Sequence, residues 1–298
     1  MPAKTAALIR HERIPADGVR LHVVGAGEGH PVVLLHGFPE NWRSWRHQIG
    51  PLAEAGYAVR APDLRGYNES DIPRERSAYA LRHLVDDVTA IVRTAGSGPA
   101  HVVGHDWGGV IAWIVAAEYP ELVDRLVILN APHPDLYFRA VRRPAQLWRS
   151  SYVLVFQMRP LAEWLLSAAD FFLIRQMFTS AAGRPGVYAK AEIDAYVAGL
   201  SRDGALTAAL NYYRANFRWA TRRLGHLAAI RAPTLVIWGE QDPALGVELL
   251  DGLDQVVPDV EVHRISTAGH WVQNEAPGEV NRILLSFLKR SFPSDERL

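Results

Sequence analysis

The residue with the clearest chemical meaning in this chain is an aspartate at the centre of a glycine-flanked turn. The turn is Gly104-His105-Asp106-Trp107-Gly108, with an apolar β-type run before it and a helical pattern, residues 110–117, after it. Strand, sharp turn and helix together predict a nucleophile elbow, in which the central side chain projects at the start of a helix whose free N–H groups face it. Glycine is needed on both sides because a side chain at Gly104 or Gly108 would collide with neighbouring backbone.

The carboxylate of Asp106, at a position where serine is the usual residue, decides the class of reaction. Attack by a carboxylate on an ester or amide would give a high-energy anhydride. Attack on a saturated carbon gives an alkyl ester that water can then cleave. The predicted substrate therefore carries its leaving group on sp³ carbon, as an epoxide or an alkyl halide does. Aspartate is also a favoured helix N-cap residue, but the flanking glycines and the partners described next favour a nucleophile.

Two later residues complete a predicted nucleophile–acid–histidine set. Asp242 and His270 follow Asp106 in that order, each after the carboxyl end of a predicted strand, where ligands bind in open α/β sheets. His270 would be the general base for water, and Asp242 would orient its imidazole. Asp242 could instead only stabilise the turn in which it lies, and His270 could be an ordinary surface histidine. The chain order favours the catalytic reading of both.

Hydrolysis of an ester also requires an oxyanion hole. Phe38 follows Gly37 directly after a predicted strand, and its backbone N–H is one expected donor. The second is the N–H of Trp107, the residue after the nucleophile. We expect the Phe38–Pro39 bond to be cis, as proline allows in tight turns.

Composition excludes several classes of function. The chain has 298 residues, of which 49% are apolar, enough for one large domain or for a core with an insertion. The 32 basic and 32 acidic residues cancel, which argues against a nucleic-acid partner. With no cysteine there is no disulfide or thiolate metal site. The N-terminus lacks a secretory h-region and no apolar run reaches membrane-spanning length, so we expect a soluble cytoplasmic protein without stable membrane insertion.

The elements that must position these residues alternate between strand and helix. A β-hairpin pattern is followed by alternating strands and helices up to residue 134, and the alternation resumes near residue 234. Between them, residues 135–225 show almost no strand pattern and are helical and rich in aromatics. The chain thus predicts an α/β fold with a mostly parallel central sheet flanked by helices. Its expected parts are a first core segment, 1–134, a helical cap, 135–225, and a second core segment, 226–298. Strands are expected at 7–13, 19–25, 31–35, 57–61, 101–103, 126–129, 234–238 and 260–265, and helices at 42–55, 79–94, 110–117 and 274–288.

Four motifs together resemble the epoxide hydrolases of the α/β-hydrolase fold. They are His36-Gly37-Phe38-Pro39-Glu40, Asp63-Leu64-Arg65-Gly66-Tyr67, Gly104-His105-Asp106-Trp107-Gly108 and Gly269-His270-Trp271. The resemblance spans the core and reaches into the cap. It implies the α/β-hydrolase fold, a small apolar epoxide as substrate and a vicinal diol as product. It implies no cofactor and no metal, and either a monomer or a homodimer.

The resemblance also assigns two cap tyrosines. Epoxide opening generates an alkoxide, and a phenol with a pKa near ~10 suits its protonation. Tyr152 matches the first family tyrosine and Tyr213 the second, although Tyr212 lies directly beside it. A helical tyrosine more commonly packs between helices, and that alternative applies to both residues.

Two other functions remain open at this stage. Haloalkane and fluoroacetate dehalogenases share the fold and the aspartate nucleophile. In haloalkane dehalogenases, the position that matches Phe38 holds an Asn that binds halide, and Phe has no such donor. In the fluoroacetate enzymes an Arg follows the nucleophile, whereas this chain has Trp107 there. The Trp107 indole could still donate to a halide, so haloalkane or haloacid dehalogenation is the alternative. An inactive small-molecule receptor would be expected to have lost part of the catalytic set, which is complete here.

The remaining expectations concern the surroundings of the reacting groups. The family implies that Glu40 and His105 position the hydrolytic water, although His105 could equally be structural. Phe38, Trp107, Phe156 and Trp271 are expected in the substrate pocket. The aromatic residues of the cap are expected mainly to pack between helices; they are Trp148, Phe156, Trp164, Phe171 and Phe172.

Overall fold

The computed structural model describes residues 9–290 except 97, 181, 185 and 223–226. Its centre is an eight-stranded sheet in the order β1-β2-β4-β3-β5-β6-β7-β8. The pairs β1/β2 and β2/β4 are antiparallel, and all the others are parallel. The strands are β1 (Arg10–Pro15), β2 (Arg20–Ala26), β3 (His30–Leu35), β4 (Tyr57–Pro62), β5 (Ala100–His105), β6 (Val123–Leu129), β7 (Thr234–Gly239) and β8 (Val260–Ile265).

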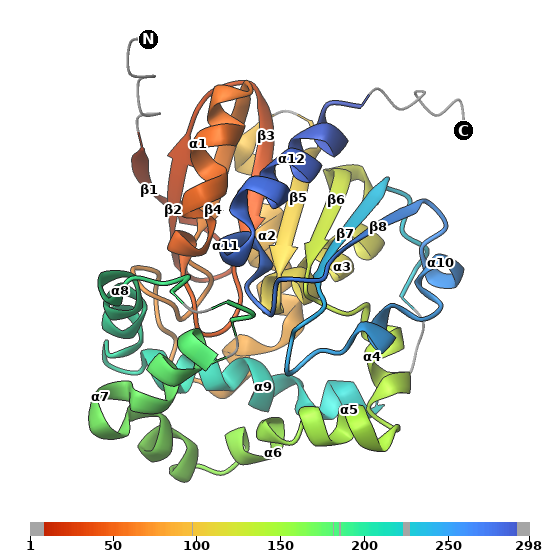
Figure 1. The fold of residues 1–298 in the computed structure, drawn as a ribbon. Helices are drawn as coiled ribbons and strands as arrows, with labels where there is room; N and C mark the ends of the chain where they lie inside the picture. Colours follow the sequence, from red (N-terminus) through yellow and green to blue (C-terminus); the bar gives the residue numbers. More distant parts are fainter. Residues whose placement is uncertain (1–8, 97, 181, 185, 223–226, 291–298) are drawn as a thin grey trace.

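Helices cover both faces of this sheet, so the strands in its middle are buried on both sides (Figure 1). One face carries α1 (Arg46–Glu54), α11 (Val272–Glu275) and α12 (Pro277–Leu288), and the other carries α2 (Leu81–Ala95) and α3 (Trp107–Glu118). Each face has its own apolar core, because alternate strand residues point to opposite sides. The predicted α/β-hydrolase fold, with a mostly parallel sheet between helical layers, is confirmed.

Two expected helices are divided in the structure. The helix expected over residues 42–55 begins as a 3₁₀ turn, Trp42–Trp45, before α1. The helix expected over 274–288 is split into α11 and α12, because Pro277 lacks the N–H that a continuous helix needs and instead occupies the first turn of α12. The helix expected over residues 79–94 begins only at Leu81, as α2, because Tyr79 belongs to another 3₁₀ turn, Arg76–Tyr79. The start of the expected strand 7–13 lies partly outside the described residues.

All the regular secondary structure described between β6 and β7 is helical. This helical insertion consists of α4 (Pro134–Ala140), α5 (Pro144–Arg149), α6 (Tyr152–Phe156), α7 (Leu161–Ser180), α8 (Lys190–Leu200) and α9 (Ala205–Arg222). The backbone of α7 leaves helical geometry at Ala168–Phe171. The expected end of the cap, residue 225, lies outside the described residues. Two short helices follow β7, a 3₁₀ turn at Val247–Leu250 and α10 (Leu253–Val256). A further 3₁₀ turn, Pro120–Leu122, precedes β6.

The aromatic residues of the insertion do not all pack between helices. Phe156 is buried, but Trp148, Trp164 and Phe172 are 79%, 66% and 52% exposed. The helices α5, α6 and α7 lie at the outer border of the molecule, where no further layer covers them (Figure 1). The expectation of interhelical packing is therefore wrong for those three residues. No helix in the described part is both long and apolar enough to cross a membrane.

Candidate active site

The elbow has the geometry that its sequence predicts. Asp106 occupies the N-cap position of α3 at φ 50° and ψ −120°. A Cβ on Gly104 would lie 2.5 Å from the Gly108 carbonyl oxygen, and one on Gly108 would lie 2.3 Å from that of Leu35. Both glycines are therefore required by close backbone approach. Gly37, whose role the sequence does not reveal, is required as well, since its Cβ would lie 2.4 Å from Cβ of Asp106.

The Asp106 carboxylate is aimed away from its own helix. It makes no capping bond to α3, which removes helix capping as its role. Oδ1 instead accepts a hydrogen bond of 2.8 Å from the backbone N–H of Phe38, and Oδ2 lies 3.9 Å from Nε2 of His270. One carboxylate oxygen is thus held by a backbone dipole while the other faces the imidazole.

The loop after β3 supplies this backbone donor. Its Phe38–Pro39 bond is cis, as predicted. The other expected donor, the Trp107 N–H, gives no hydrogen bond to the Asp106 carboxylate within the described part of the chain. Because Trp107 is the first residue of α3, its N–H has no carbonyl partner within that helix.

Asp242 is fixed by four hydrogen bonds. Oδ2 lies 2.7 Å from Nδ1 of His270 and accepts a bond of 2.9 Å from Nδ2 of Asn130. Oδ1 accepts from the N–H groups of Ala244 and Leu245 at 2.8 and 2.9 Å. Burial opposes the ionised form, but the charge of His270 and these bonds prevail and lower the pKa of Asp242. The carboxylate is thus held ionised and in one orientation.

The sequence reasoning missed Asn130. It lies directly after β6 with φ 38°. Its side-chain amide donates hydrogen bonds to Asp242 and to the carbonyl oxygen of Gly239, and it accepts one from the N–H of Gly239. A signal was present, because this amide residue ends a buried apolar strand at the edge of the sheet where the other site residues were placed.

His270 is buried among carboxylates. Burial would by itself lower the pKa of this imidazole. The charge of Asp242 and its hydrogen bond, with smaller contributions from Asp106 and Glu40, outweigh burial and raise the pKa of His270 to about 9. Its Nδ1 must donate to the carboxylate of Asp242, which only accepts. Nε2 is therefore the nitrogen directed at Asp106.

A second buried carboxylate lies beside this pair. Glu40 is 1% exposed, and its Oε2 lies 3.1 Å from Nδ1 of His105. Neither atom makes a hydrogen bond. Nε2 of His105 lies 2.9 Å from the carbonyl oxygen of His270 and donates to it. Within the described residues the site thus contains two buried polar atoms that face each other without a hydrogen bond, next to the imidazole of His270.

A small apolar cavity of about 130 Å³ lies between the sheet and the helical insertion. Asp106 and Trp107 line it from the elbow, and Tyr152 of α6 and Tyr213 of α9 line it from the insertion. Its other lining residues are Leu81, Val110, Pro132, Pro134, Tyr137, Phe138, Val153, Asn216, Phe217 and Leu245. We call this cavity, with these residues, the pocket. One carboxylate and several phenols therefore face a space that is otherwise almost entirely hydrocarbon.

Tyr152 and Tyr213 are held mainly by aromatic rings. The ring of Tyr213 meets those of Phe38 and Trp107 edge-on, with centroids 5.6 and 5.1 Å away, and the ring of Tyr152 lies 6.1 Å from it. Burial, with weaker effects of neighbouring phenols and of Asp106, raises the pKa of both tyrosines well above its usual value. Both hydroxyls therefore keep their protons at neutral pH.

The neighbouring Tyr212 has a different environment. Its hydroxyl donates a hydrogen bond of 2.7 Å to the carbonyl oxygen of Arg65, and its ring contacts those of Tyr67 and Tyr79. It does not line the pocket. Successive helical residues point about 100° apart, so one tyrosine packs into the core and the other faces the pocket.

The predicted pocket residues need correction. Of the four expected, only Trp107 lines the pocket. Phe38 and Phe156 pack edge-on against the ring of Tyr213, with centroids 5.6 and 5.0 Å from it. Trp271 stacks on Phe178 at 4.9 Å. Their rings are occupied in packing the layer around the pocket.

Comparison with known proteins agrees with this geometry. Residues 30–277 match the family model of the alpha/beta hydrolase fold. The chain is 39% identical to epoxide hydrolase 4 of Mus musculus, over 95% of this chain and 80% of that protein. It is 37% identical to epoxide hydrolase A of Mycobacterium tuberculosis, over 92% of this chain and 96% of that protein. A crystal structure of Bacillus megaterium epoxide hydrolase in complex with an inhibitor superposes with a TM-score of 0.88 and 33% identity, over 94% of this chain and all of that one. This chain therefore belongs to the α/β-hydrolase superfamily and, within it, to the epoxide hydrolase family.

Proposed function

We propose that this enzyme converts a small apolar epoxide and water into a vicinal diol through an alkyl ester on Asp106. The observation that carries the proposal is the pocket itself, in which the Asp106 carboxylate and the hydroxyl-bearing rings of Tyr152 and Tyr213 line one apolar cavity. The segment 135–225 then acts as a cap that encloses the substrate and supplies the phenols.

In the first half-reaction, Oδ2 of Asp106 attacks an epoxide carbon. The new bond joins Oδ2 to that carbon, and the bond between the carbon and the ring oxygen breaks. Oδ1 keeps its hydrogen bond to Phe38 and becomes the carbonyl oxygen of the ester. Tyr152 and Tyr213 hydrogen-bond the developing alkoxide, and one of them gives it a proton. The raised pKa of both phenols keeps them protonated at neutral pH, so each has a proton to donate.

In the second half-reaction, His270 removes a proton from water, which attacks Cγ of the ester. Negative charge then develops on Oδ1, where the Phe38 N–H already points, with the Trp107 N–H as the second proposed donor. The tetrahedral intermediate collapses, Oδ2 leaves with the diol, and the imidazolium gives its proton to that oxygen. The carboxylic acid left on Asp106 then gives up the second proton of the water, which restores the phenol that protonated the alkoxide in the first half-reaction. Asp242 orients the imidazole and stabilises its cation.

The charges around His270 support its role as a base in the second half-reaction. Asp106 is one of the groups that raise the pKa of His270 to about 9 in the free enzyme. Formation of the ester removes that negative charge, so the pKa of His270 falls when the imidazole has to act as a base. Oε2 of Glu40 and Nδ1 of His105 face each other beside this imidazole without a hydrogen bond, and a water molecule that donates to them would be placed for attack.

Dehalogenation remains the second candidate, because the Trp107 ring lines the pocket and its indole could donate to a halide. A panel of styrene oxide, cyclic epoxides, fatty-acid epoxides and haloalkanes distinguishes the two. We expect diols from one or more epoxides and slower or no halide release, with Asp106→Ala inactive in every assay. Consumption of haloalkanes alone would contradict the proposal. Binding of epoxides without turnover would instead indicate a small-molecule receptor.

A further inference from the structure

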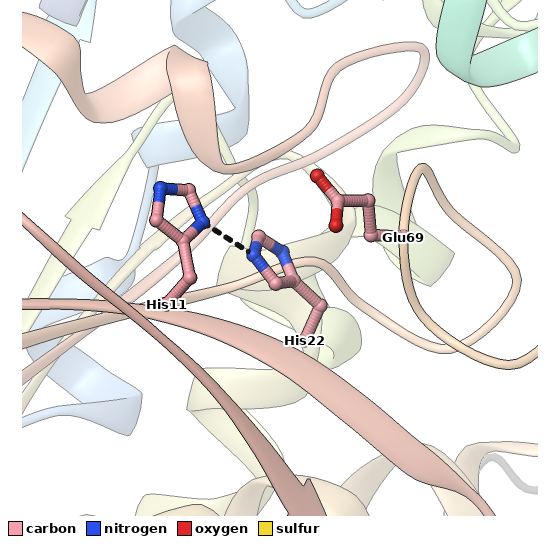
Figure 2. A group of neighbouring side chains, drawn as sticks. All are labelled: His11, His22 and Glu69. Carbon is pink, nitrogen blue, oxygen red and sulfur yellow. Dashed lines mark hydrogen bonds between the residues drawn. The ribbon is translucent and has the colours of Figure 1, made fainter.

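Three potential metal ligands meet at the antiparallel edge of the sheet. His11 lies on β1, His22 on β2, and Glu69 on the turn that follows β4 (Figure 2). One nitrogen or oxygen atom from each lies within 4.8 Å of the others. None of the three lines the pocket, and the inference drawn from them is independent of the proposed function.

The backbone holds the three residues on one side of the hairpin. His11 pairs with Val24 and His22 with Arg13, so the two histidines are diagonal neighbours on the same face of the β1/β2 ladder. The turn that carries Glu69 is tied to β2, because the Ser70 hydroxyl accepts a bond of 2.9 Å from the His22 N–H. The same hydroxyl donates to the carbonyl oxygen of Asp63 at 2.6 Å. The arrangement thus belongs to the folded framework.

A buried carboxylate orients His22 from behind. Oδ2 of Asp63 lies 2.7 Å from Nδ1 of His22, and Asp63 and His22 are 0% and 2% exposed. A carboxylate only accepts, so Nδ1 of His22 carries the proton and Nε2 presents its lone pair outward. Histidine ligands of metal ions typically have this arrangement, because a carboxylate behind the ring fixes its tautomer and orientation.

His11 completes a pair of nitrogen ligands. Its Nδ1 lies 2.8 Å from Nε2 of His22 and donates the proton that the two atoms share (Figure 2). A metal ion can replace this proton if His11 moves its hydrogen to Nε2, which lies on an exposed ring. For zinc–nitrogen distances of about 2.1 Å in tetrahedral geometry, the two nitrogens need to separate to about 3.4 Å. Rotation of His11 provides that small opening.

Glu69 is available as the third ligand. Its side chain is exposed, and within the described part of the chain its carboxylate makes no hydrogen bond or ion pair. Its backbone N–H bonds to Oδ2 of Asp63 at 3.3 Å, which places the start of this side chain beside His22. Rotation about the exposed side chain brings an oxygen to an ion held by the two imidazoles.

We propose that His11, His22 and Glu69 bind a divalent first-row transition-metal ion such as Zn²⁺, with water completing its coordination. Two imidazoles and a carboxylate are a ligand set that suits zinc. Sequence patterns do not indicate this site, because the ligands lie in three separate segments without motif spacing. The ion would link the β1/β2 hairpin to the turn after β4 and would stabilise the folded chain by mass action.

Among the residues that the structure describes, two other groups of potential ligands are less suited. His30, His101 and Asp124 have no buried carboxylate behind a histidine, and Asp124 already lies 3.1 Å from Nδ1 of His101. In the group of Asp17, His83 and Asp86, Asp17 is engaged by His83 and lies 3.6 Å from Arg65. The first of these groups provides a matched control.

The test is calorimetric titration of Zn²⁺ into the full chain, free of any polyhistidine tag and stripped with EDTA. We expect saturable binding of one equivalent, a rise in Tm with added Zn²⁺, and visible absorption bands when Co²⁺ is used instead. His11→Ala should lose all three signals and Glu69→Gln should weaken binding, with near-ultraviolet circular dichroism showing that both variants fold. His30→Ala should bind as the parent does.

X-ray absorption at the zinc edge adds a structural readout, with two imidazole nitrogens expected at about 2.0–2.1 Å. Absence of saturable binding to the parent chain would overturn the proposal. Binding that survives His11→Ala, or that depends on His30, would overturn it as well.

Discussion

On the sheet side of the pocket, the groups that change charge are held by hydrogen bonds, whereas on the insertion side the phenols are held mainly by ring packing, with side-chain hydrogen bonding among Tyr152, Tyr213 and Trp107. Asp242 has four hydrogen-bond donors, and Asp106 has a backbone N–H on Oδ1. Tyr152 and Tyr213 are surrounded by one another, Phe156, Phe38 and Trp107. Fixed dipoles stabilise developing charge without reorganisation, while a neutral acid requires only a defined position and a retained proton.

The largest expected effect comes from removing both phenols on the insertion side. Each of Tyr152→Phe and Tyr213→Phe should slow ester formation by roughly 10²–10⁴-fold, the usual contribution of a positioned acid, and the double variant should nearly abolish it. Hydrolysis of the ester should change much less, because its charge develops on Oδ1 of Asp106. Rapid-quench measurement of ester formation with an epoxide and with a haloalkane tests this.

Tyr212→Phe is the matched control for these variants. It removes a hydroxyl from the same helix, one that donates to the Arg65 carbonyl oxygen and does not face the pocket. We expect a loss of about 1 kcal/mol in the free energy of unfolding and an unchanged rate of ester formation. Epoxide opening at the parental rate by the double Phe variant would exclude the phenols as acids.

The next effect concerns the base on the sheet side. His270→Gln should slow ester hydrolysis by roughly 10²–10⁴-fold, while ester formation proceeds, because the attacking group is already a carboxylate. Intact-mass spectrometry after mixing with substrate should therefore find the ester accumulating on the variant. His263→Gln, at a histidine of β8 outside the pocket, serves as control. A His270→Gln enzyme that turns over normally without a covalent adduct would remove His270 from the mechanism.

The two sides of the pocket also differ in how far the sequence predicts them. The positions of Asp106, Asp242 and His270 could be predicted because sharp turns at strand ends require glycine and polar residues in fixed order. The cis Phe38–Pro39 bond and the steric need for Gly104 and Gly108 follow from the same local chemistry. Strand–helix alternation likewise predicted the parallel sheet.

The packing of the insertion could not be predicted in this way. An aromatic residue on a helix shows the same pattern whether it lines a pocket, as Tyr152 does, fills the layer behind it, as Phe156 does, or faces solvent, as Trp148 does. Which outcome holds depends on the neighbouring helix and not on local sequence. The break between α11 and α12 was missed because the apolar periodicity continues across Pro277.

A further expected effect is on the pH dependence of stability. Because the pKa of His270 is raised from 6.5 to about 9 in the folded chain, the folded state binds this proton more tightly than the unfolded state does. The resulting stabilisation is complete below pH 6.5 and is lost as pH rises through about 9. Urea unfolding of parent and His270→Gln at several pH values should show their difference in unfolding free energy changing across this window. A difference that stays constant with pH would show that the imidazole is not held charged by its neighbours.

The covalent ester on Asp106 is tested most directly by a single turnover in H₂¹⁸O, with enzyme in excess over epoxide. If water attacks Cγ of the ester, the label enters the Asp106 carboxylate, and the diol of that first turnover contains two unlabelled oxygens, the ring oxygen of the epoxide and the oxygen that Oδ2 supplied. Peptide mass spectrometry should then find ¹⁸O on the peptide that contains Asp106 and none in the diol. Label in the diol with an unlabelled Asp106 would show that water opens the epoxide directly and would contradict the mechanism.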